Sequence, residues 1–222
     1  MTIHADTPPV SSATGRPLTK RGQETRRRLL EAAEQVFADL GYHEASIVKI
    51  TEHAGVALGT FYLYFDSKQS IFEALVIDLN SRVRHSMSEA MAGATNRIEA
   101  EGLGFEGFFR FTAEHPALYR VVREAEFVSP ATLKLHYERI VDGYRAGLDA
   151  AQRDGEIAAE LDTEVVAWAL MGAGELIGMR YLLWERDAEG RPPAKIDPAV
   201  LAGMSGFIAR ALRPDTTEGT DR

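Results

Sequence analysis

The chain has 222 residues, which is enough for one large domain or two small ones whose core holds without cross-links. Hydrophobic residues make up 45% and charged residues 26%, as in ordinary soluble proteins, and the lack of cysteine excludes disulfides, thiolate metal sites and a cysteine nucleophile. The net charge of −8 disfavours polyanion binding by the molecule as a whole. Residues 16–28 differ, because they hold six basic side chains and one acidic side chain. A solvated helix start would give the same pattern.

Helical periodicity runs along almost the whole chain, and no stretch shows the alternation of a β-strand. Caps, prolines and glycines set the ends of the expected elements. In chain order, we expect helices over residues 29–40, 46–53, 57–64, 68–91, 116–127, 129–154, 162–184 and 197–212. Residues 93–107 contain four glycines and are expected to form an irregular connection. The predicted fold class is therefore all-α.

Residues 165–184 are mostly apolar over a length that could cross a bilayer. Glu175 and Arg180 lie inside this stretch, and each charge near a bilayer centre would cost roughly 2.5–3.5 kcal/mol on the insertion scale. A helix buried in a large soluble core explains the pattern better. The N-terminus also lacks the basic and apolar regions of a secretory signal, so we expect a soluble protein without a membrane span.

Two short predicted helices, joined by a turn at Gly55 and packed on a longer first helix, form a helix-turn-helix. Phe61 and Phe65 lie one turn apart with Leu58 near them, and we expect them to face the core. Thr60 lies on a neighbouring arc, toward solvent or a DNA groove. The spacing alone also fits a small three-helix core that carries surface tyrosines.

The stretch from Thr25 to Ile71 resembles the N-terminal domain of the TetR family of transcriptional regulators. The matching residues are Thr25, Arg26, Leu29, Leu30, Ala32, Ala33, Phe37, Gly41 and Tyr42, the run AGVALGTFYLYF over residues 54–65, and then Lys68 and Ile71. Ala45, Thr51 and Ala57 depart from the usual residues. These departures bear on individual DNA contacts rather than on the fold.

The resemblance implies an N-terminal three-helix DNA-binding domain and a C-terminal helical domain for ligand binding and dimerisation. The expected division is a disordered tail over residues 1–18, the helix-turn-helix domain over 19–68, the ligand-binding and dimerisation domain over 69–213, and a second tail over 214–222. Tail composition, rich in small and polar residues, supports the outer two boundaries.

The resemblance also implies roles for individual residues. Positions that typically hold the phosphate backbone are Ser46, Tyr62, Tyr64 and Lys68. Positions that usually approach base edges are Lys49, Leu58, Gly59, Thr60 and Leu63. An N-terminal arm of Arg16, Lys20 and Arg21 could add phosphate or minor-groove contacts. Because residues 57–65 contain no Arg, Asn or Gln, base recognition would use thymine methyl groups and a contact from Lys49 to guanine.

In the family, the last two helices of each subunit pair into a four-helix bundle, and the sequence supports this independently. Glycine costs about 1 kcal/mol in a helix interior, so glycines among large apolar residues often mark close backbone approach. The predicted interface glycines are Gly172, Gly174, Gly178, Gly203 and Gly206. An intramolecular contact is the alternative.

The middle of the chain is rich in aromatic residues, most of which are expected to be core. A few could line an effector pocket. The predicted lining residues are Phe108, Phe111, Phe127, Tyr137, Trp168 and Met171, with His136, Arg180 and Glu175 as polar candidates. Composition favours a lipophilic or aromatic effector, such as an acyl thioester.

An enzyme is the first alternative, because residues 102–107 match G-x-G-x-x-G. A dinucleotide site needs a preceding strand, and residues 97–101 are not one. The six histidines show no metal-binding spacing, and no serine has a nucleophile-elbow context. We therefore expect no catalytic residue, no cofactor and no metal site.

Together these patterns predict a cytoplasmic, nucleoid-associated homodimer that binds a double-stranded DNA operator and a small-molecule effector. A repressor that the effector releases from a palindromic operator is the favoured interpretation. The alternative is a helical small-molecule-binding protein that has lost DNA binding.

Overall fold

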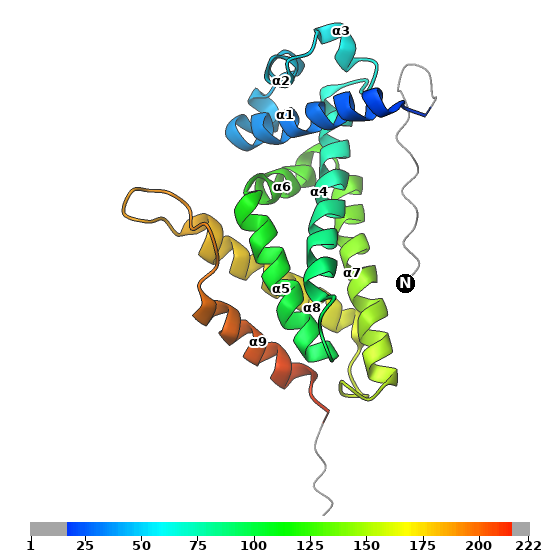
Figure 1. Ribbon diagram of the computed structural model, residues 1–222, viewed down its shortest axis with the longest axis vertical. Coiled ribbons are helices and arrows are strands. Elements are labelled where there is room, and N and C mark those ends of the chain that lie inside the picture. The colour runs from blue at the N-terminus through cyan, green and yellow to red at the C-terminus, as the bar shows by residue number, and fades with distance from the viewer. Residues whose placement is uncertain (1–16, 215–222) are drawn as a thin grey trace, which may run out of the picture. The chain divides into compact units, whose positions relative to one another are not determined.

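The computed structural model describes residues 17–214, and every regular element in this range is helical (Figure 1). The all-α prediction is confirmed. The predicted tails fall almost entirely outside the described residues, as does Arg16 of the predicted arm. Contacts divide the described chain into two units. Unit 1 holds the residues up to Asp78 and Ala117–Leu133, and unit 2 holds Leu79–Pro116 and the residues from Lys134 onward.

Unit 1 contains α1 (Lys20–Glu44), α2 (Ile47–Ala54), α3 (Leu58–Phe61), the first part of α4 (Lys68–Met91) and α6 (Ala117–Val128). Helix α1 packs against both α2 and α6. The core is apolar and fully buried at its centre, where the largest side chains are Leu29, Phe37, Ile50, Phe61, Ile71, Phe72 and Leu75. The expected DNA-binding domain ends at residue 68, whereas unit 1 also includes the start of α4 and α6, which packs on α1.

Local chemistry sets the helix ends in unit 1. The hydroxyl of Thr19 accepts from the amide of Gly22 (3.2 Å) at the start of α1. Gly41 interrupts α1 with φ of +75°, as its position in the sequence predicts. A Cβ at Gly41 would also lie 2.6 Å from Oε1 of Glu124 and 2.7 Å from Nη2 of Arg120, both on α6. The positive φ therefore requires glycine there, while the flexible ends of Arg120 and Glu124 are the atoms that a larger residue would displace.

Helix α3 is shorter than predicted, with four residues in place of the expected range 57–64. After Phe61 the amides of Leu63 and Tyr64 bond to carbonyls three residues back, at 3.2 and 2.9 Å. This tighter bonding replaces the α-helical pattern with turns before α4 begins. Phe61 and Phe65 still reach the same core, with ring centroids 5.7 Å apart. Leu58 differs from the expectation of burial, since 46% of it is exposed.

Unit 2 contains the rest of α4, α5 (Arg97–Glu114), α7 (Pro130–Arg153) after its first turn, α8 (Thr163–Gly178), the π-helical turn η1 (Met179–Trp184) and α9 (Pro198–Leu212). Helix α5 packs against α8 and α9. Asp162 caps α8 and Asp197 caps α9, as predicted. The buried core gathers mainly Phe105, Phe109, Tyr144, Leu148, Leu170, Leu182 and Ile208.

The predicted irregular connection over residues 93–107 is wrong, because α5 begins at Arg97. Gly104 and Gly107 lie against α4, and Gly102 lies against Ser205 of α9, so these glycines serve packing rather than loop flexibility. A Cβ at Gly107 would lie 2.7 Å from the carbonyl oxygen of Ser86, and one at Gly104 would lie 3.1 Å from the sulfur of Met91. The G-x-G-x-x-G match therefore lies inside a helix, which is not the strand-to-helix junction of a dinucleotide site.

The segment Thr163–Trp184 is long and apolar enough, by length and composition, to cross a membrane. It is not the fully buried core helix that the sequence predicts, because only 33% of its most apolar window is buried. Ala167, Leu170 and Gly174 face the core, whereas Val165 and Leu176 are mostly exposed. The helix thus has one buried face and one exposed apolar face.

Candidate DNA-binding interface

The helix-turn-helix consists of α2, the turn at Gly55 and α3. Gly55 adopts φ of +64°, and its amide donates to the carbonyl of Glu52 (3.1 Å) at the end of α2. Ile50 on α2 and Phe61 on α3 are both fully buried. The two short helices are therefore held by a local turn and by a shared core, and their other faces are left to solvent.

The exposed face of the helix-turn-helix is largely apolar. Four large side chains on it are about half exposed, namely Val48, Leu58, Tyr62 and Leu63. Lys49 is exposed as well, and its ammonium lies 3.2 Å from the carbonyl oxygen of Glu44. A Cβ at Gly59 would meet nothing within 4 Å, so the backbone there is open to close approach. Such a face can contact thymine methyl groups and sugar edges in a groove. The sequence analysis did not single out Val48.

Ser46, Tyr62 and Tyr64, for which the resemblance implies phosphate contacts, differ in their exposure and hydrogen bonds. Ser46 is the N-cap of α2, where its hydroxyl oxygen accepts from the amide of Lys49 (3.2 Å). Its own O–H remains able to donate to a phosphate oxygen. Tyr62 is about half exposed, while Tyr64 and Thr60 are partly buried.

Lys68 is engaged inside unit 1, which the sequence analysis did not foresee. Its Nζ donates to three backbone carbonyls at the end of α1, those of Tyr42 (2.7 Å), His43 (3.2 Å) and Ala45 (2.8 Å). It also lies 4.4 Å from the centroid of the Tyr42 ring. An ammonium has three donors, and a cation is stabilised at a helix C-terminus. The geometry therefore gives Lys68 a structural role, and a phosphate would have to compete with these carbonyls.

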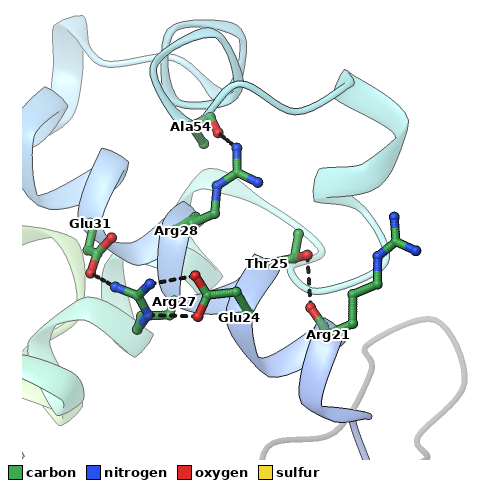
Figure 2. A network of polar contacts seen from close by, with 7 residues as sticks. All are labelled: Arg21, Glu24, Thr25, Arg27, Arg28, Glu31 and Ala54. Carbon is green, nitrogen blue, oxygen red and sulfur yellow. Dashed lines mark hydrogen bonds and ion pairs between the residues drawn. The ribbon is translucent and has the colours of Figure 1, made fainter.

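Much of the basic stretch at the start of α1 is also engaged (Figure 2). The guanidinium of Arg27 pairs with Glu24 and Glu31. Arg28 donates to the carbonyl of Ala54 at the end of α2 and thereby links α1 to the helix-turn-helix turn. Of the predicted arm, Lys20 and Arg21 are exposed, and the Arg21 side chain points away from the Arg27 pairs. The pattern of charges in the sequence thus overstates the charge available to DNA.

Helix α6 clasps the end of α1 through two side chains that the sequence analysis missed. Nη1 of Arg120 donates to the carbonyl of Ala38 (2.6 Å), and Oε2 of Glu124 accepts from the amide of Tyr42 (2.9 Å). The partners are 82 residues apart in each case, so no local pattern could have found them.

The residues predicted to line an effector pocket do not form one group. Phe127 lies in unit 1 and is 82% exposed, so it differs from the expectation. In unit 2, Phe111 is buried, and its ring centroid lies 4.5 Å from that of His115. Phe108 and Met171 are partly buried against the core. Tyr137 donates its hydroxyl to Glu175 (3.2 Å) and lies 6.3 Å from the Trp168 ring, centroid to centroid.

The predicted interface glycines separate into two groups. Gly172 and Gly203 have nothing within 4 Å of a hypothetical Cβ, and at Gly206 only Arg210 comes within that distance. At Gly174 a Cβ would lie 2.5 Å from the ring of Phe105, and Gly178 is buried. The close approach at Gly174 is therefore the intramolecular alternative. The outward faces of α8 and α9 carry four large exposed apolar side chains: Val165, Trp168, Leu176 and Phe207. We call these four residues, with Gly172 and Gly203, the apolar outer face.

Metal-binding side chains do not gather in the described residues. Within residues 17–214, no group of three or more His, Asp or Glu side chains is placed to hold a metal ion.

Known proteins resemble this chain in both sequence and fold. The family model for bacterial regulatory proteins of the tetR family matches residues 29–75. The HTH-type transcriptional regulator YdgC of Bacillus subtilis, described as uncharacterized, is 33% identical over 75% of this chain and 85% of its own length. The fatty acid metabolism regulator protein of Bacillus subtilis is 29% identical over 65% of this chain and 77% of its own length. A crystal structure of the transcriptional regulator FadR from Bacillus subtilis in complex with stearoyl-CoA is 21% identical, with a TM-score of 0.71 over 83% of this chain and 98% of that one, which shows a shared fold.

Proposed function

Because the chain belongs to the TetR family and is therefore a ligand-responsive transcriptional regulator, we propose that it is a homodimeric repressor of a palindromic operator. A small lipophilic effector would release it from DNA. The observation that carries the proposal is the exposed, largely apolar face of the helix-turn-helix, where Leu58, Leu63 and Val48 lie in water unless a groove covers them.

The geometry of unit 1 supports different DNA contacts for its polar and its apolar side chains. The hydroxyls of Ser46 and Tyr62, together with the exposed Lys20 and Arg21, are suited to phosphate oxygens. Lys49 and the apolar side chains of the helix-turn-helix are suited to the major groove. Affinity would then come from phosphate contacts, and base preference from thymine-rich positions.

The apolar outer face supports a dimer. Large apolar side chains on two helices would lie in water in a monomer, and exposed patches of this kind mark protein interfaces. Gly172 and Gly203 leave room for the backbone of a partner helix to approach. A two-fold dimer would place two helix-turn-helix units on half-sites roughly 34–36 Å apart.

The effector proposal has chemical and family support. Unit 2 is rich in aromatic and methionine side chains, and a protein of the same fold binds stearoyl-CoA. Release from DNA requires an effector with higher affinity for the state that does not fit the operator. The proposal assigns the protein a cytoplasmic location, where operator and acyl metabolites meet, and no catalytic activity.

The test is a genome-wide selection of DNA fragments bound by the purified full chain, followed by footprinting of the selected sites at two salt concentrations. We expect protection of a roughly palindromic site with a steep negative salt dependence. Release of the protein on addition of a long-chain acyl compound is expected in the same assay. No salt-dependent DNA binding would contradict the proposal and would favour a binding protein that has lost DNA recognition.

Variants sharpen the assignment within the interface. Arg21→Met is expected to lower the salt slope by about one, and Leu63→Ala to weaken binding only at its preferred bases. Lys134→Met is the matched control, because this lysine is exposed on unit 2 and pairs with Glu138 on its own helix. A similar loss of binding in the control would show that charge in general, and not this interface, controls affinity.

A further inference from the structure

Unit 2 buries an amide whose hydrogen bonds are incomplete. Asn80 on α4 is 1% exposed, and its Nδ2 donates to Nδ1 of His136 (3.1 Å) and to the carbonyl oxygen of His136 (2.9 Å). The carbonyl can only accept, so it fixes which end of the amide faces α7. Oδ1 of Asn80 has no partner.

The same hydrogen bond determines which ring nitrogen of His136 can donate. Because Nδ1 accepts from Asn80, the proton of the neutral ring lies on Nε2, which becomes a donor. Burial lowers the pKa of His136 to about 4, and the nearby positive charge of Arg84 acts in the same direction. The imidazole is therefore neutral at physiological pH, with its donor pointing away from Asn80.

Two further side chains of unit 2 have a buried donor atom without a partner. Arg84 follows Asn80 by one turn of α4, and its buried Nε has no partner. Thr112 on α5 is fully buried, and its hydroxyl has no partner either.

The pairing of the two helices places Thr112 beside this part of α4. The hydroxyl of Ser86 donates to the carbonyl of Gly107 (3.1 Å), and a nitrogen of Arg82 lies 2.9 Å from Nε2 of His115. Residues 110–112 of α5 thus lie alongside residues 82–86 of α4.

A second arginine in unit 2 differs in part. Nη2 of Arg97 pairs with the buried carboxylate of Glu101, although the Nε of Arg97, like that of Arg84, has no partner. Among the described residues, Arg84 has no such ion pair. Buried polar atoms are nearly always hydrogen-bonded, so unsatisfied donors gathered in one region indicate a missing acceptor. Met87 and Phe108, one helical turn from Arg84 and Thr112, are apolar and only partly buried.

We propose that Arg84, Thr112 and His136 receive the acyl oxygen of the effector, with Asn80 positioning the imidazole. The ligand class is a long-chain carboxylate or its thioester, whose oxygen accepts from the three donors while its chain lies along Met87 and Phe108. Ion pairing and donor number favour an acceptor-rich head group. This inference rests on the proposed function, because it assumes an effector site in unit 2.

The experiment titrates the full chain with palmitate, palmitoyl-CoA and hexadecanol and follows the binding by calorimetry. We expect palmitate or palmitoyl-CoA to bind, hexadecanol to bind at least tenfold more weakly, and Arg84→Met and Thr112→Val each to weaken acyl binding at least tenfold. The comparison of palmitate with palmitoyl-CoA separates the two sources of the acyl oxygen. Arg110→Met, an exposed position on the same helix as Thr112, is the control and should bind as the wild type does.

Thr112→Val keeps the side-chain shape, so it tests the proposal even if Arg84→Met fails to fold. Equal acyl affinity in Thr112→Val and the wild type would overturn the inference, and so would a wild type that binds none of the three probes. Footprinting of the same preparations separates the two proposals. Operator protection without a response to acyl probes overturns this inference alone, whereas no protection by the wild type overturns the proposed function.

Discussion

Units 1 and 2 satisfy their polar groups in different ways. In unit 1, charged side chains are used to close the backbone, since Lys68 and Arg28 cap helix ends and Arg120 and Glu124 clasp α1. In unit 2, buried donors on Arg84 and Thr112 have no partner. Both units expose large apolar side chains, such as Phe127 in unit 1 and Trp168 in unit 2, so the contrast lies in the buried polar atoms.

This contrast suggests why the two halves of one chain carry different tasks. A DNA-binding unit must keep a fixed shape, and internal hydrogen bonds provide it. A sensing unit must bind its ligand with different affinities in two conformations, and polar groups without an internal partner are available to bind that ligand. Four predictions test the contrast, beginning with the largest expected effect.

The first prediction concerns the apolar outer face of unit 2. Trp168→Glu and Phe207→Glu place a carboxylate in the proposed dimer interface, so we expect the dimer to weaken by about 100-fold and operator binding to fall with it. Sedimentation across a concentration series measures the change. Phe127→Glu is the control, because Phe127 is even more exposed than Trp168 and Phe207 but lies in unit 1. If both interface variants stay dimeric, these helices do not form the interface.

The second prediction concerns the hydrogen bonds that Lys68 makes within unit 1. Lys68→Met removes the ammonium that three carbonyls share, so we expect a loss of about 2 kcal/mol in the free energy of unfolding of unit 1. Denaturant unfolding monitored by hydrogen exchange of α1 and α2 measures it. Lys49→Met, which removes one exposed carbonyl contact, should change stability by no more than about 0.5 kcal/mol. Unchanged stability with weaker operator binding in Lys68→Met would instead favour a direct phosphate contact.

The third prediction concerns the pH dependence of unit 2. The pKa of His136 is lowered to about 4 by burial, so the unfolded chain binds the proton more strongly below pH 6.5. Folding stability is therefore lost as pH falls from 6.5 toward 4, by about 2 kcal/mol at pH 5. We expect His136→Gln to lack this part of the pH dependence in unfolding measurements. His85→Gln is the control, because His85 is exposed on α4, and the same pH slope in both variants would contradict the assignment.

The fourth prediction separates folding from DNA binding at Ser46. Ser46→Ala removes the cap of α2 and should destabilise unit 1 by about 1 kcal/mol. Ser46→Asp restores a capping oxygen, so its stability should be close to that of the wild type, but its negative charge should weaken operator binding if a phosphate lies nearby. Wild-type operator affinity in Ser46→Asp would place Ser46 away from the DNA backbone.

The sequence was most informative where the structure depends on neighbours along the chain. Ser46 as a cap, Gly55 as a turn, and Asp162 and Asp197 as helix starts were all predictable, because each acts on residues two to four positions away. The glycines of α5 show the limit of such reasoning. In the sequence they indicate an irregular connection. In the structure they lie within helix α5, and Gly107 allows the backbones of α5 and α4 to come close together.

The candidate site shows the same limit. The resemblance placed Lys68 on the DNA, and composition gave residues 16–28 a strong positive charge. Whether those charges are available depends on carbonyls and carboxylates that the fold brings to them, and for Lys68 these are 23–26 residues away.

By itself, the sequence determined an all-α fold and the helix-turn-helix, because helical periodicity, caps and turns are local properties, and the resemblance of residues 25–71 indicated the TetR family. Only the tertiary structure decided which cations remain exposed, which face of α8 is buried and which polar atoms lack partners. Those properties depend on pairs such as Arg120 with Ala38 and Asn80 with His136, which are 82 and 56 residues apart. No pattern within a single helix specifies such a pair, because each residue is compatible with its own helix whether or not the distant partner is present.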